Sequence, residues 1–287
     1  MTTRSETSPD VGGANQDDPS SWDPSFRGGV LCLSGGMDST SLLLHLLAKG
    51  VTVRALSYDY GQKHRFELQR VEAQLAYLAE CGYRVEHRIV DLAVLGPLFD
   101  SALTDPDRPI PEGHYENASM RQTVVPNRNA IFASIAYGYA LSTAQKSGDR
   151  VALGLGVHAG DHAIYPDCRP EFYAALHRAF EVGNWDADRV RLYLPFLQGD
   201  KETILRDAER SIEQLGLDFE RVFRNTLTSY DPDPLGRSSG RTGADVERIL
   251  AFHAIGRPDP VDYVASWPEV LAWALECRRE FESERGG

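Results

Sequence analysis

The sequence predicts an α/β fold in which a parallel sheet carries helices on both faces. Short apolar runs alternate with longer segments of helical periodicity along most of the chain, and such alternation is typical of parallel sheets covered on both sides. The 287 residues are enough to bury a substantial core. With 42% hydrophobic and 25% charged residues, the composition is that of a soluble globular protein.

The first strand and the first helix show the pattern most clearly. "GGVLCLSG" (28–35) is a short apolar run that stops at glycines, and "DSTSLLLHLLAKG" (38–50) has helical periodicity and ends at Lys-Gly. The same alternation continues in chain order. Further strands are expected at 52–61, 83–92, 150–158 and 190–196. Further helices are expected at 65–82, 127–148, 170–183 and 201–216, and then near 242–255 and 267–284.

The pattern divides the chain into three parts. Residues 1–26 are rich in Ser, Thr, Asp, Gly and Pro and have almost no aliphatic side chains, so we expect a disordered tail. Residues 27–225 form the α/β domain, and residues 226–287 form a C-terminal segment with an irregular stretch and two helices. Within the domain, residues 95–125 are irregular, and a loop of that length usually covers something.

Charge and cysteine content narrow the function classes. The net charge of −12 and the pI near 5.1 give no reason to expect nucleic acid as a partner, because gripping a phosphate backbone needs clustered Lys and Arg. The four cysteines are too far apart for a zinc site or a disulfide framework. We see neither the ~18 apolar residues of a membrane span nor a secretory signal. We therefore expect a cytoplasmic protein with reduced thiols.

The loop after the first strand, "LSGGMDST" (33–40), predicts a phosphate-binding site. Ligands of open α/β sheets bind beyond the carboxyl ends of the strands, and Gly35 and Gly36 let the backbone turn sharply and approach a ligand. The N–H groups at the start of the next helix favour a phosphate. The loop also offers hydroxyls and a carboxylate that could orient a metal or cap the helix, namely Ser34, Asp38, Ser39 and Thr40. A glycine turn with a Ser/Thr N-cap is the alternative.

This stretch, "SGGMDST", resembles the signature loop of the PP-loop ATP pyrophosphatases, whose Rossmann-like fold is that of the adenine nucleotide alpha hydrolases. Three further stretches narrow the family: "YDYGQKHRFE" (58–67), "VPNRNAIF" (125–132) and "YPDCRPEF" (165–172). In this order and spacing they resemble the 7-cyano-7-deazaguanine synthases, from about residue 28 to residue 262. The chain is identified as a diverged member of that family.

The resemblance implies an ATP-dependent carbon–nitrogen ligase. In the family, 7-carboxy-7-deazaguanine attacks the α-phosphate of ATP and gives an acyl-adenylate and pyrophosphate. Ammonia then gives an amide, and a second ATP dehydrates the amide to the nitrile. This chemistry needs no enzyme nucleophile, but it needs positioning, Mg²⁺ and charge stabilisation at the phosphates. The expected cofactors are ATP and Mg²⁺, and the expected substrates are a deazaguanine carboxylate and ammonia.

The second and third motifs supply candidate binding residues. Tyr58 is expected to bind ATP, and Asp59 and Gln62 the substrate, because they follow a strand at its carboxyl end; core packing is the alternative for Tyr58. Asn127 and Arg128 start a helix and could meet phosphate or carboxylate. The alternative for this pair is an N-cap Asn beside a surface Arg.

The stretch "YPDCRPEF" is expected on the substrate side. A carboxylate such as Asp167 accepts two adjacent N–H donors of a guanine-like edge together, and Arg169 could face the substrate carboxylate or its adenylate. A surface Asp–Arg pair before a helix is the alternative. Tyr165 and Asp161 complete the expected substrate-binding set. Lys201, which matches a family lysine, is expected to reach the phosphates, or else to be a solvated lysine. The expected catalytic residues are Asp38, Asp167, Arg169 and Lys201.

The chain departs from the family at its zinc site. The family carries four zinc cysteines in the arrangement S-C-Y … C-G-x-C-x-x-C-x-x-R-x-x-A-F, where this chain has "TSY" (228–230) and "SGRTGADVERILAF" (239–252). The four ligand positions become Ser229, Ser239, Thr242 and Asp245. Hydroxyls bind Zn²⁺ poorly and one carboxylate cannot close a tetrahedral site, so we expect no zinc. We expect packing and hydrogen bonds to hold the segment, with Asp245 or Thr242 capping the next helix.

A second departure leaves the nitrogen acceptor open. The substrate-side loop has Ala163-Ile164 where the family usually has Ser-Gly. Nitrile formation is the conservative expectation, and transfer of the activated substrate to another amine, such as a protein N-terminus, is the alternative. Diverged family members encoded among antiphage defence genes support that alternative. A nucleotide-binding scaffold without catalysis is disfavoured by the intact motifs. The sequence leaves the oligomeric state open, with a homodimer as one option.

Overall fold

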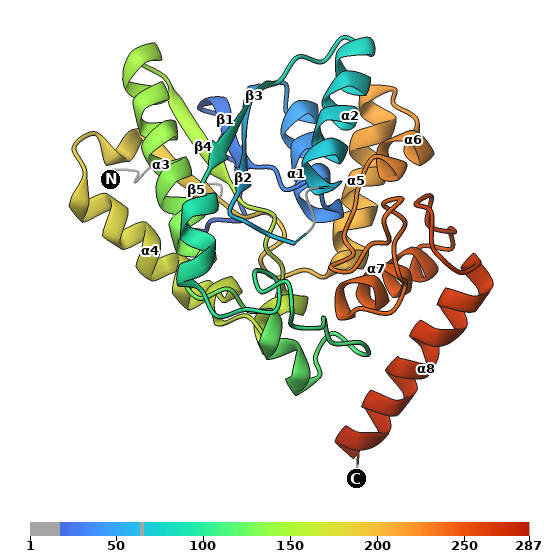
Figure 1. The fold of residues 1–287 in the computed structure, drawn as a ribbon. Coiled ribbons are helices and arrows are strands. Elements are labelled where there is room, and N and C mark those ends of the chain that lie inside the picture. Colours follow the sequence, from blue (N-terminus) through green and yellow to red (C-terminus); the bar gives the residue numbers. More distant parts are fainter. Residues whose placement is uncertain (1–17, 64–65, 287) are drawn as a thin grey trace, which may run out of the picture.

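The computed structural model describes residues 18–63 and 66–286, with a five-stranded sheet at the centre (Figure 1). The strands are β1 Phe26–Cys32, β2 Thr52–Asp59, β3 Glu86–Asp91, β4 Arg150–Gly154 and β5 Val190–Tyr193. Their order in the sheet is β3-β2-β1-β4-β5, and all neighbouring pairs are parallel. Parallel neighbours require crossover connections, which the intervening helices provide. The predicted parallel α/β sheet is confirmed.

The predicted helices are all present, and one further helix was missed. The helices are α1 Met37–Ala48, α2 Phe66–Glu80, α3 Arg128–Ser147, α4 Pro170–Gly183, α5 Lys201–Leu215, α6 Phe219–Arg224, α7 Gly243–Ala254 and α8 Trp267–Gly286. Short 3₁₀ helices are η1 Ala93–Leu98, η2 Ala118–Thr123, η3 Ala159–Ala163, η4 Pro166–Cys168 and η5 Ala187–Arg189. Helix α6 has six residues, too few for a helical period to show in the sequence. None of the helices in the described part of the chain is long and apolar enough to span a membrane.

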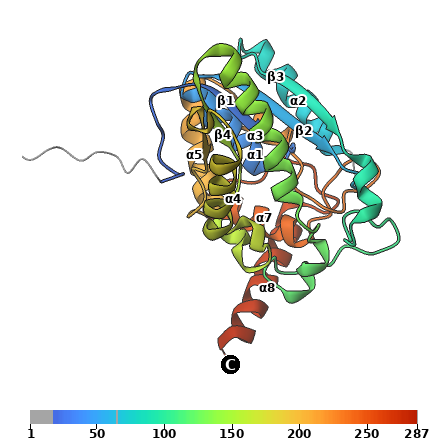
Figure 2. The ribbon, with the colours of Figure 1, turned by 90° about the vertical axis from the view of Figure 1, so that its left-hand side faces the viewer.

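Helices cover both faces of the sheet. Successive residues of a strand point to opposite faces, and in β1 Leu31 belongs to the core against α1, α2 and α5, whereas Val30 belongs to the core against α3 and α4. Figure 1 shows α3 and α4 on one side of the sheet and α1, α2 and α5 on the other. Figure 2, which looks onto α3 and α4, shows the same layers from another side.

Part of the predicted N-terminal tail packs on the domain. The disordered tail was expected over residues 1–26; its first 17 residues lie outside the described part, but residues 18–26 pack on the domain. Trp22 meets Tyr193 of β5 edge to face, with ring centroids 5.1 Å apart. Asp23 pairs with Arg150 of β4 at 2.6 Å. The expectation of disorder is wrong for residues 18–26. The average composition of the segment does not show that Trp22 and Asp23 each contact the domain.

The predicted helical C-terminal segment is confirmed. Helix α7 packs beside α5, and α8 packs on α7 through a small apolar cluster of Val246, Ile249, Val270, Ala274 and Cys277. In Figure 1, α8 lies at the lower right edge of the molecule. The segment is therefore attached to the helix layer that contains α5.

A buried ion pair ties α7 to the chain that follows it. The Arg248 guanidinium donates to Asp259 through Nε at 2.6 Å and Nη2 at 2.9 Å, and both side chains are almost fully buried. Arg248 also donates to the hydroxyls of Thr226 and Thr228. Fork-like pairing of this kind gives the buried guanidinium a full set of acceptors.

We expect Asp259→Ala to lower the free energy of unfolding by about 3–5 kcal/mol, because it leaves a buried guanidinium without its counter-charge. The matched control is Glu209→Ala, which removes the partner of Arg257 in an exposed pair of similar length, 2.9 Å. An exposed pair contributes about 0–1 kcal/mol. Urea unfolding followed by circular dichroism measures both; equal losses in the two variants would contradict the assignment.

Candidate active site

A cavity of about 270 Å³ lies at the carboxyl ends of β1, β2 and β4. Its wall comes from the loops after these strands and from the starts of α2, α3, α5 and α7. This is where open parallel sheets bind ligands. The predicted site residues that line it are Ser34, Gly36, Asp38, Ser39, Tyr58, Gln62, Arg128, Tyr165 and Lys201. The fold thus brings residues that are far apart in the sequence to one cavity.

The loop after β1 presents backbone N–H groups at the start of α1. Gly35 has a φ of +88°, and a Cβ there would overlap the carbonyl oxygen of Glu67, so the position requires glycine. Gly36 is the N-cap of α1, and no side chain caps this helix. The Ser34 N–H donates to Ser39 Oγ at 3.1 Å, and the two hydroxyls lie 3.0 Å apart. An uncapped helix start with hydroxyls beside it is suited to a phosphate.

Thr40 is the predicted ATP-binding hydroxyl that does not line the cavity. It is 1% exposed, and its Oγ1 has no hydrogen-bond partner within the described part of the chain. The first turn of α1 carries Thr40 to the side of the helix that faces the core.

Four charged or titratable side chains meet at one wall of the cavity. Lys201, the first residue of α5, places Nζ 2.8 Å from Asp38 Oδ2 and 3.1 Å from Glu247 Oε2. His158, in the loop after β4, lies with Nε2 3.0 Å from the same Nζ. The four residues come from four separate segments, so the folded domain alone creates the cluster. Lys201 is therefore not a solvated lysine, which was the alternative interpretation, because its side chain is only 6% exposed.

The cluster keeps Asp38 ionised. Burial would raise the pKa of the Asp38 carboxyl, but the charge of Lys201, with smaller contributions from His158 and Arg248, leaves that pKa lowered. Asp38 Oδ1 is buried and has no hydrogen-bond partner within the described part of the chain. A carboxylate oxygen beside an uncapped helix start is a suitable ligand for a Mg²⁺ ion whose other ligands come from phosphates.

Tyr58 belongs to both the core and the cavity wall. Its ring stacks on Phe132 with centroids 4.1 Å apart, and its hydroxyl donates to the Phe132 carbonyl at 2.9 Å. Burial, followed by the nearby Cys32 thiol, raises the pKa of the Tyr58 hydroxyl well above its usual range. Tyr58 therefore packs in the core and also lines the cavity. Ligand binding and core packing, the two interpretations of its position in the sequence, are compatible.

A second charged group lies across the cavity, at the starts of α2 and α3. Arg128 and Glu67 both line the cavity, together with Tyr60. Burial raises the pKa of the Glu67 carboxyl to about 7, although the charge of Arg128 lowers it. Burial would lower the pKa of the Arg128 guanidinium, but neighbouring tyrosines, Tyr60 first, leave it raised. Arg128 therefore stays cationic, whereas Glu67 titrates near neutral pH.

Two of the predicted residues around the start of α2 and α3 lie outside the cavity lining. Asp59, at the end of β2, accepts the Gly61 N–H at 3.4 Å. Asn127 is the N-cap of α3 with a left-handed backbone, φ +60°, and its side chain makes no cap hydrogen bond. Gln62 does line the cavity and accepts the Tyr60 N–H at 2.9 Å. These contacts shape the loops on which the lining residues stand.

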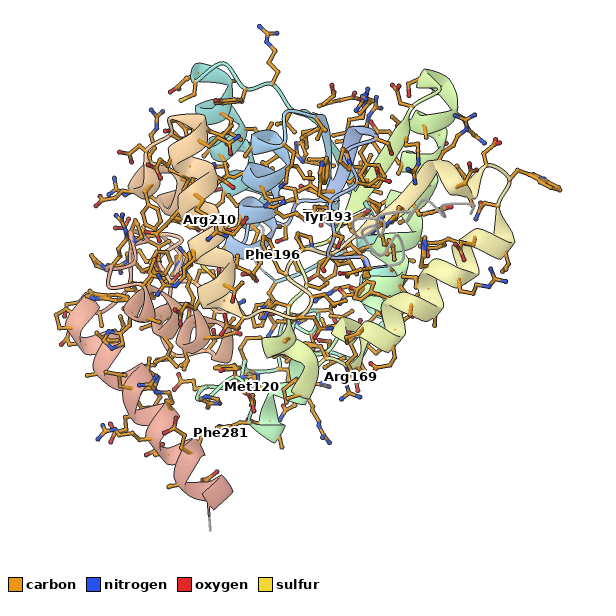
Figure 3. All side chains as sticks on the ribbon, turned by 180° about the vertical axis from the view of Figure 1, so that it is seen from behind. Met120, Arg169, Tyr193, Phe196, Arg210 and Phe281 are labelled. Atoms are coloured by element: carbon orange, nitrogen blue, oxygen red, sulfur yellow. The ribbon has the colours of Figure 1, made fainter. Side chains whose placement is uncertain are left out.

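The "YPDC" stretch reaches the cavity with Tyr165 and Cys168 but not with Asp167 or Arg169. Asp167 accepts the Asn129 N–H at 3.4 Å at the start of α3. Arg169 precedes α4 as its N-cap residue and is exposed at the rim of the molecule (Figure 3). Asp161 lies in η3, and its side chain falls outside the described part of the structure.

The four positions of the family's zinc ligands converge on one carboxylate oxygen, Asp245 Oδ2. The hydroxyls of Ser229, Ser239 and Thr242 each lie 2.9 Å from it, and the Thr242 N–H lies 3.2 Å from it. We call these four residues the Asp245 cluster. The Asp245 N–H in turn donates to Thr242 Oγ1 at 3.3 Å, which completes a capping box at the start of α7. The predicted helix cap is confirmed.

The Asp245 cluster joins the C-terminal segment to the cavity. Gly243, in the first turn of α7, is so close to Met120 that a Cβ would lie 2.9 Å from the Met120 sulfur. Thr242 pairs with Glu112 as an isolated β-bridge, and the Gly113 N–H donates to the Arg241 carbonyl at 3.0 Å. The long irregular segment 95–125 is thereby fixed over the cavity, which Leu103, Tyr115 and Met120 line.

Several ionisable residues of this site were not predicted from the sequence, among them Glu67, His158 and Glu247. Each lies within or beside a stretch that the sequence singles out. Glu247 lies between Asp245 and Arg248 in a helix that looks amphipathic in sequence. Its functional position shows only when α7 is docked against Lys201.

Comparisons with known proteins identify the family of this chain. The family model for the queuosine biosynthesis protein QueC matches residues 28–256. The 7-cyano-7-deazaguanine synthase of Methanoregula boonei is 44% identical over 234 residues, covering 82% of this chain and 98% of that protein. The protein of the same name from Alteromonas mediterranea is 40% identical and covers 82% and 97%. Among solved structures, NMN synthetase from Francisella tularensis aligns with 88% of this chain and 85% of its own, at 13% identity and a TM-score of 0.39.

We expect Asp245→Ala to lower the free energy of unfolding by about 3 kcal/mol, because three hydroxyls lose their shared buried acceptor. Asp245→Asn keeps one carbonyl oxygen as acceptor and should lose less. Asp262→Ala, an exposed residue of the same segment, is the control. Chemical denaturation checks the order; an Asp245→Ala loss as small as the control would show that the cluster does not hold the segment.

Glu67 makes a pH-dependent contribution to stability. A carboxyl whose pKa is raised to about 7 in the folded state keeps a proton that the unfolded chain has lost, so it favours folding less as pH rises from about 4.5 to 7. Gln resembles the protonated form, so Glu67→Gln should gain stability relative to the wild type over this range. We expect the difference in Tm to grow by roughly 2–6 °C between pH 5 and pH 8. A pH-independent difference would show that the Glu67 pKa is not raised.

Proposed function

The chain belongs to the family of the queuosine biosynthesis protein QueC, and we propose that it uses ATP to activate the carboxylate of a 7-carboxy-7-deazaguanine-type substrate. The single observation that carries the proposal is the cavity in which the uncapped start of α1, Asp38 and Lys201 face the family's substrate-side loop. The activity of the named relatives supports the choice of substrate.

The proposed chemistry balances without an enzyme nucleophile. A substrate carboxylate oxygen forms a bond to the α-phosphorus of ATP, and the bond from that phosphorus to the bridging oxygen breaks, which releases pyrophosphate. Ammonia then attacks the acyl carbon of the adenylate, AMP leaves, and the nitrogen loses a proton to give the amide. In the second round, the amide oxygen forms a bond to the α-phosphorus of a second ATP and pyrophosphate leaves. The C–O bond then breaks, AMP leaves with that oxygen, and the nitrogen loses its two protons to give the nitrile. The protein's part is to position the reactants and to stabilise charge at the phosphates.

The residues divide between the two ligands. The phosphates of ATP meet the start of α1 and the hydroxyls of Ser34 and Ser39, while Lys201 faces the same space. Tyr58 offers a ring face to the adenosine or the deazaguanine. Arg128 is a cation of the cavity wall at the start of α3 and suits the substrate carboxylate. Asp38, with its free Oδ1, is the residue that would hold Mg²⁺, which would neutralise phosphate charge.

Two carboxylates suit the N–H edge of the deazaguanine. Glu67 lines the cavity, whereas Asp167, the residue chosen from sequence, is bonded at the start of α3. We retain both as candidates because each could accept two parallel N–H donors. The carboxylate that accepts hydrogen bonds from the base can be identified by replacing each residue with its amide. The replacement of that residue should raise the KM for the deazaguanine and leave the KM for ATP unchanged.

We propose that the C-terminal segment works without zinc. The donor set at the family's ligand positions is three hydroxyls and one carboxylate, and these satisfy one another at 2.9 Å. Zn²⁺ prefers thiolate and imidazole ligands at about 2.0–2.3 Å. A donor set of this kind does not fit a structural zinc ion.

A second acceptor remains a candidate because of Ile164. This side chain is 7% exposed and lines the cavity at the position where the family usually has glycine. It narrows the substrate-side wall with an apolar group, which changes what can approach the acyl-adenylate. Transfer to another amine, such as a protein N-terminus, is therefore the alternative outcome of the assay below.

We expect the protein, with ATP, Mg²⁺ and 7-carboxy-7-deazaguanine, to release AMP and pyrophosphate and, when ammonium is added, to form the nitrile seen by product mass. Asp38→Ala and Lys201→Ala should each slow AMP release by about 100-fold or more, because charge stabilisation at the phosphates is lost. The control is Lys146→Ala, an exposed lysine on α3. A zinc-selective chelator should leave the rate unchanged.

The other outcomes separate the alternatives. Substrate-dependent AMP release without nitrile would favour another amine acceptor. No AMP under any condition would overturn the enzymatic proposal and leave a nucleotide-binding scaffold. Full activity in both Asp38→Ala and Lys201→Ala would show that the phosphates do not lie at this wall.

A further inference from the structure

We propose that Glu247 of α7 is a positioning residue that holds the Lys201 ammonium toward the phosphates, so that the C-terminal segment is part of the ATP site. The inference rests on the proposed function in assigning ATP to this cavity. It concerns nucleotide binding, however, and can be tested without any turnover.

The contacts of Lys201 carry the inference. A lysine side chain has a flexible four-carbon stem, and its ammonium has three N–H donors. Three acceptors from three segments surround it: Asp38 Oδ2 at 2.8 Å, His158 Nε2 at 3.0 Å and Glu247 Oε2 at 3.1 Å. Asp38 approaches from the α1 side, and Glu247 approaches from the C-terminal segment. Without Glu247, one of the two carboxylates that fix the direction of Nζ is lost.

The substrate-side loop is shaped around Glu247. A Cβ at Gly160 would lie 2.5 Å from Glu247 Oε1, so the backbone of η3 passes directly over the carboxylate. His158 Nδ1 lies 3.9 Å from the same oxygen. The Glu247 side chain is only 10% exposed. A carboxylate so enclosed is a fixed part of the site, and it differs in this from the solvated glutamates of α8.

The position of Glu247 is set by the Asp245 cluster. That cluster fixes the first turn of α7 through the Thr242–Asp245 capping box. Glu247 lies two residues further along the same helix, at a point that the cap therefore determines. The hydrogen bonds of the Asp245 cluster thus fix the start of α7, and the helix in turn fixes the Glu247 carboxylate beside Lys201.

Removing the Glu247 carboxylate should weaken phosphate binding. Asp38 from α1, His158 from the loop after β4 and Glu247 from α7 contact the Lys201 ammonium. Glu247→Gln keeps the size of the side chain but replaces the carboxylate that holds the ammonium. Glu247→Asp keeps the carboxylate on a stem that is shorter by one carbon.

Calorimetric titration with a non-hydrolysable ATP analogue and Mg²⁺ at pH 7.5 tests the proposal. We expect Glu247→Gln to bind the analogue about 10-fold more weakly than the wild type, because the Lys201 ammonium loses one of its two carboxylate partners. Glu247→Asp keeps the carboxylate and should restore most of the affinity. Glu276→Gln, on the exposed side of α8, is the matched control and should resemble the wild type.

Three results would overturn the proposal. Glu247→Gln could bind the analogue as tightly as the wild type does, or it could bind more tightly because a repulsive charge has gone. Glu247→Gln and Glu247→Asp could also bind equally weakly, which is the result of a purely structural role. If the wild type binds the analogue but releases no AMP with the deazaguanine, the proposed reaction fails and this inference is still tested.

Discussion

The arrangement of the site depends on one buried carboxylate, that of Asp245. It accepts hydrogen bonds from three hydroxyls and one backbone N–H, and these donors come from the two ends of a stretch that has no regular structure of its own. Because Thr242 and Asp245 form a capping box, the same contacts fix where α7 begins. The first turn of α7 then supplies part of the cavity wall, and the bridge from Thr242 to Glu112 fixes the long loop above it.

Helix α7 presents charged residues to three different partners. Asp245 and Arg248 are three residues apart and lie on neighbouring parts of one side of the helix, whereas Glu247, turned about 100° from Arg248, projects from another side. Asp245 meets the hydroxyls, Glu247 meets Lys201, and Arg248 meets Asp259. All three are buried or nearly so, and buried charges are tolerated only when they are paired. These three pairings fix the rotation of α7 about its own axis. Apolar packing against α5 and α8 alone would fix that rotation less strictly.

The sequence predicted the parallel sheet, its helices and the location of the site, because each rests on local information. Apolar runs bounded by glycine define the strands, and the loop at 33–40 needs only its own glycines to bring the N–H groups of α1 to the cavity. What it missed depends on contacts between distant segments. Glu247 becomes part of the site only when α7 docks against Lys201, and Asp167 is drawn to the Asn129 N–H instead of lining the cavity. Trp22 orders residues whose composition predicts disorder because Tyr193 lies within reach.

Replacement of zinc ligands by hydroxyls and a carboxylate changes what the segment depends on. A zinc site is held by coordination bonds and fails when the metal is removed. The Asp245 cluster is held by hydrogen bonds to one buried oxygen, while the other, Oδ1, has no partner within the described part of the chain. Burial raises the pKa of the Asp245 carboxyl, although the hydrogen bonds from Ser239, Thr242 and Ser229 oppose this. Because the unfolded chain ionises first, the cluster favours folding most at acidic pH and less as pH rises through its folded pKa.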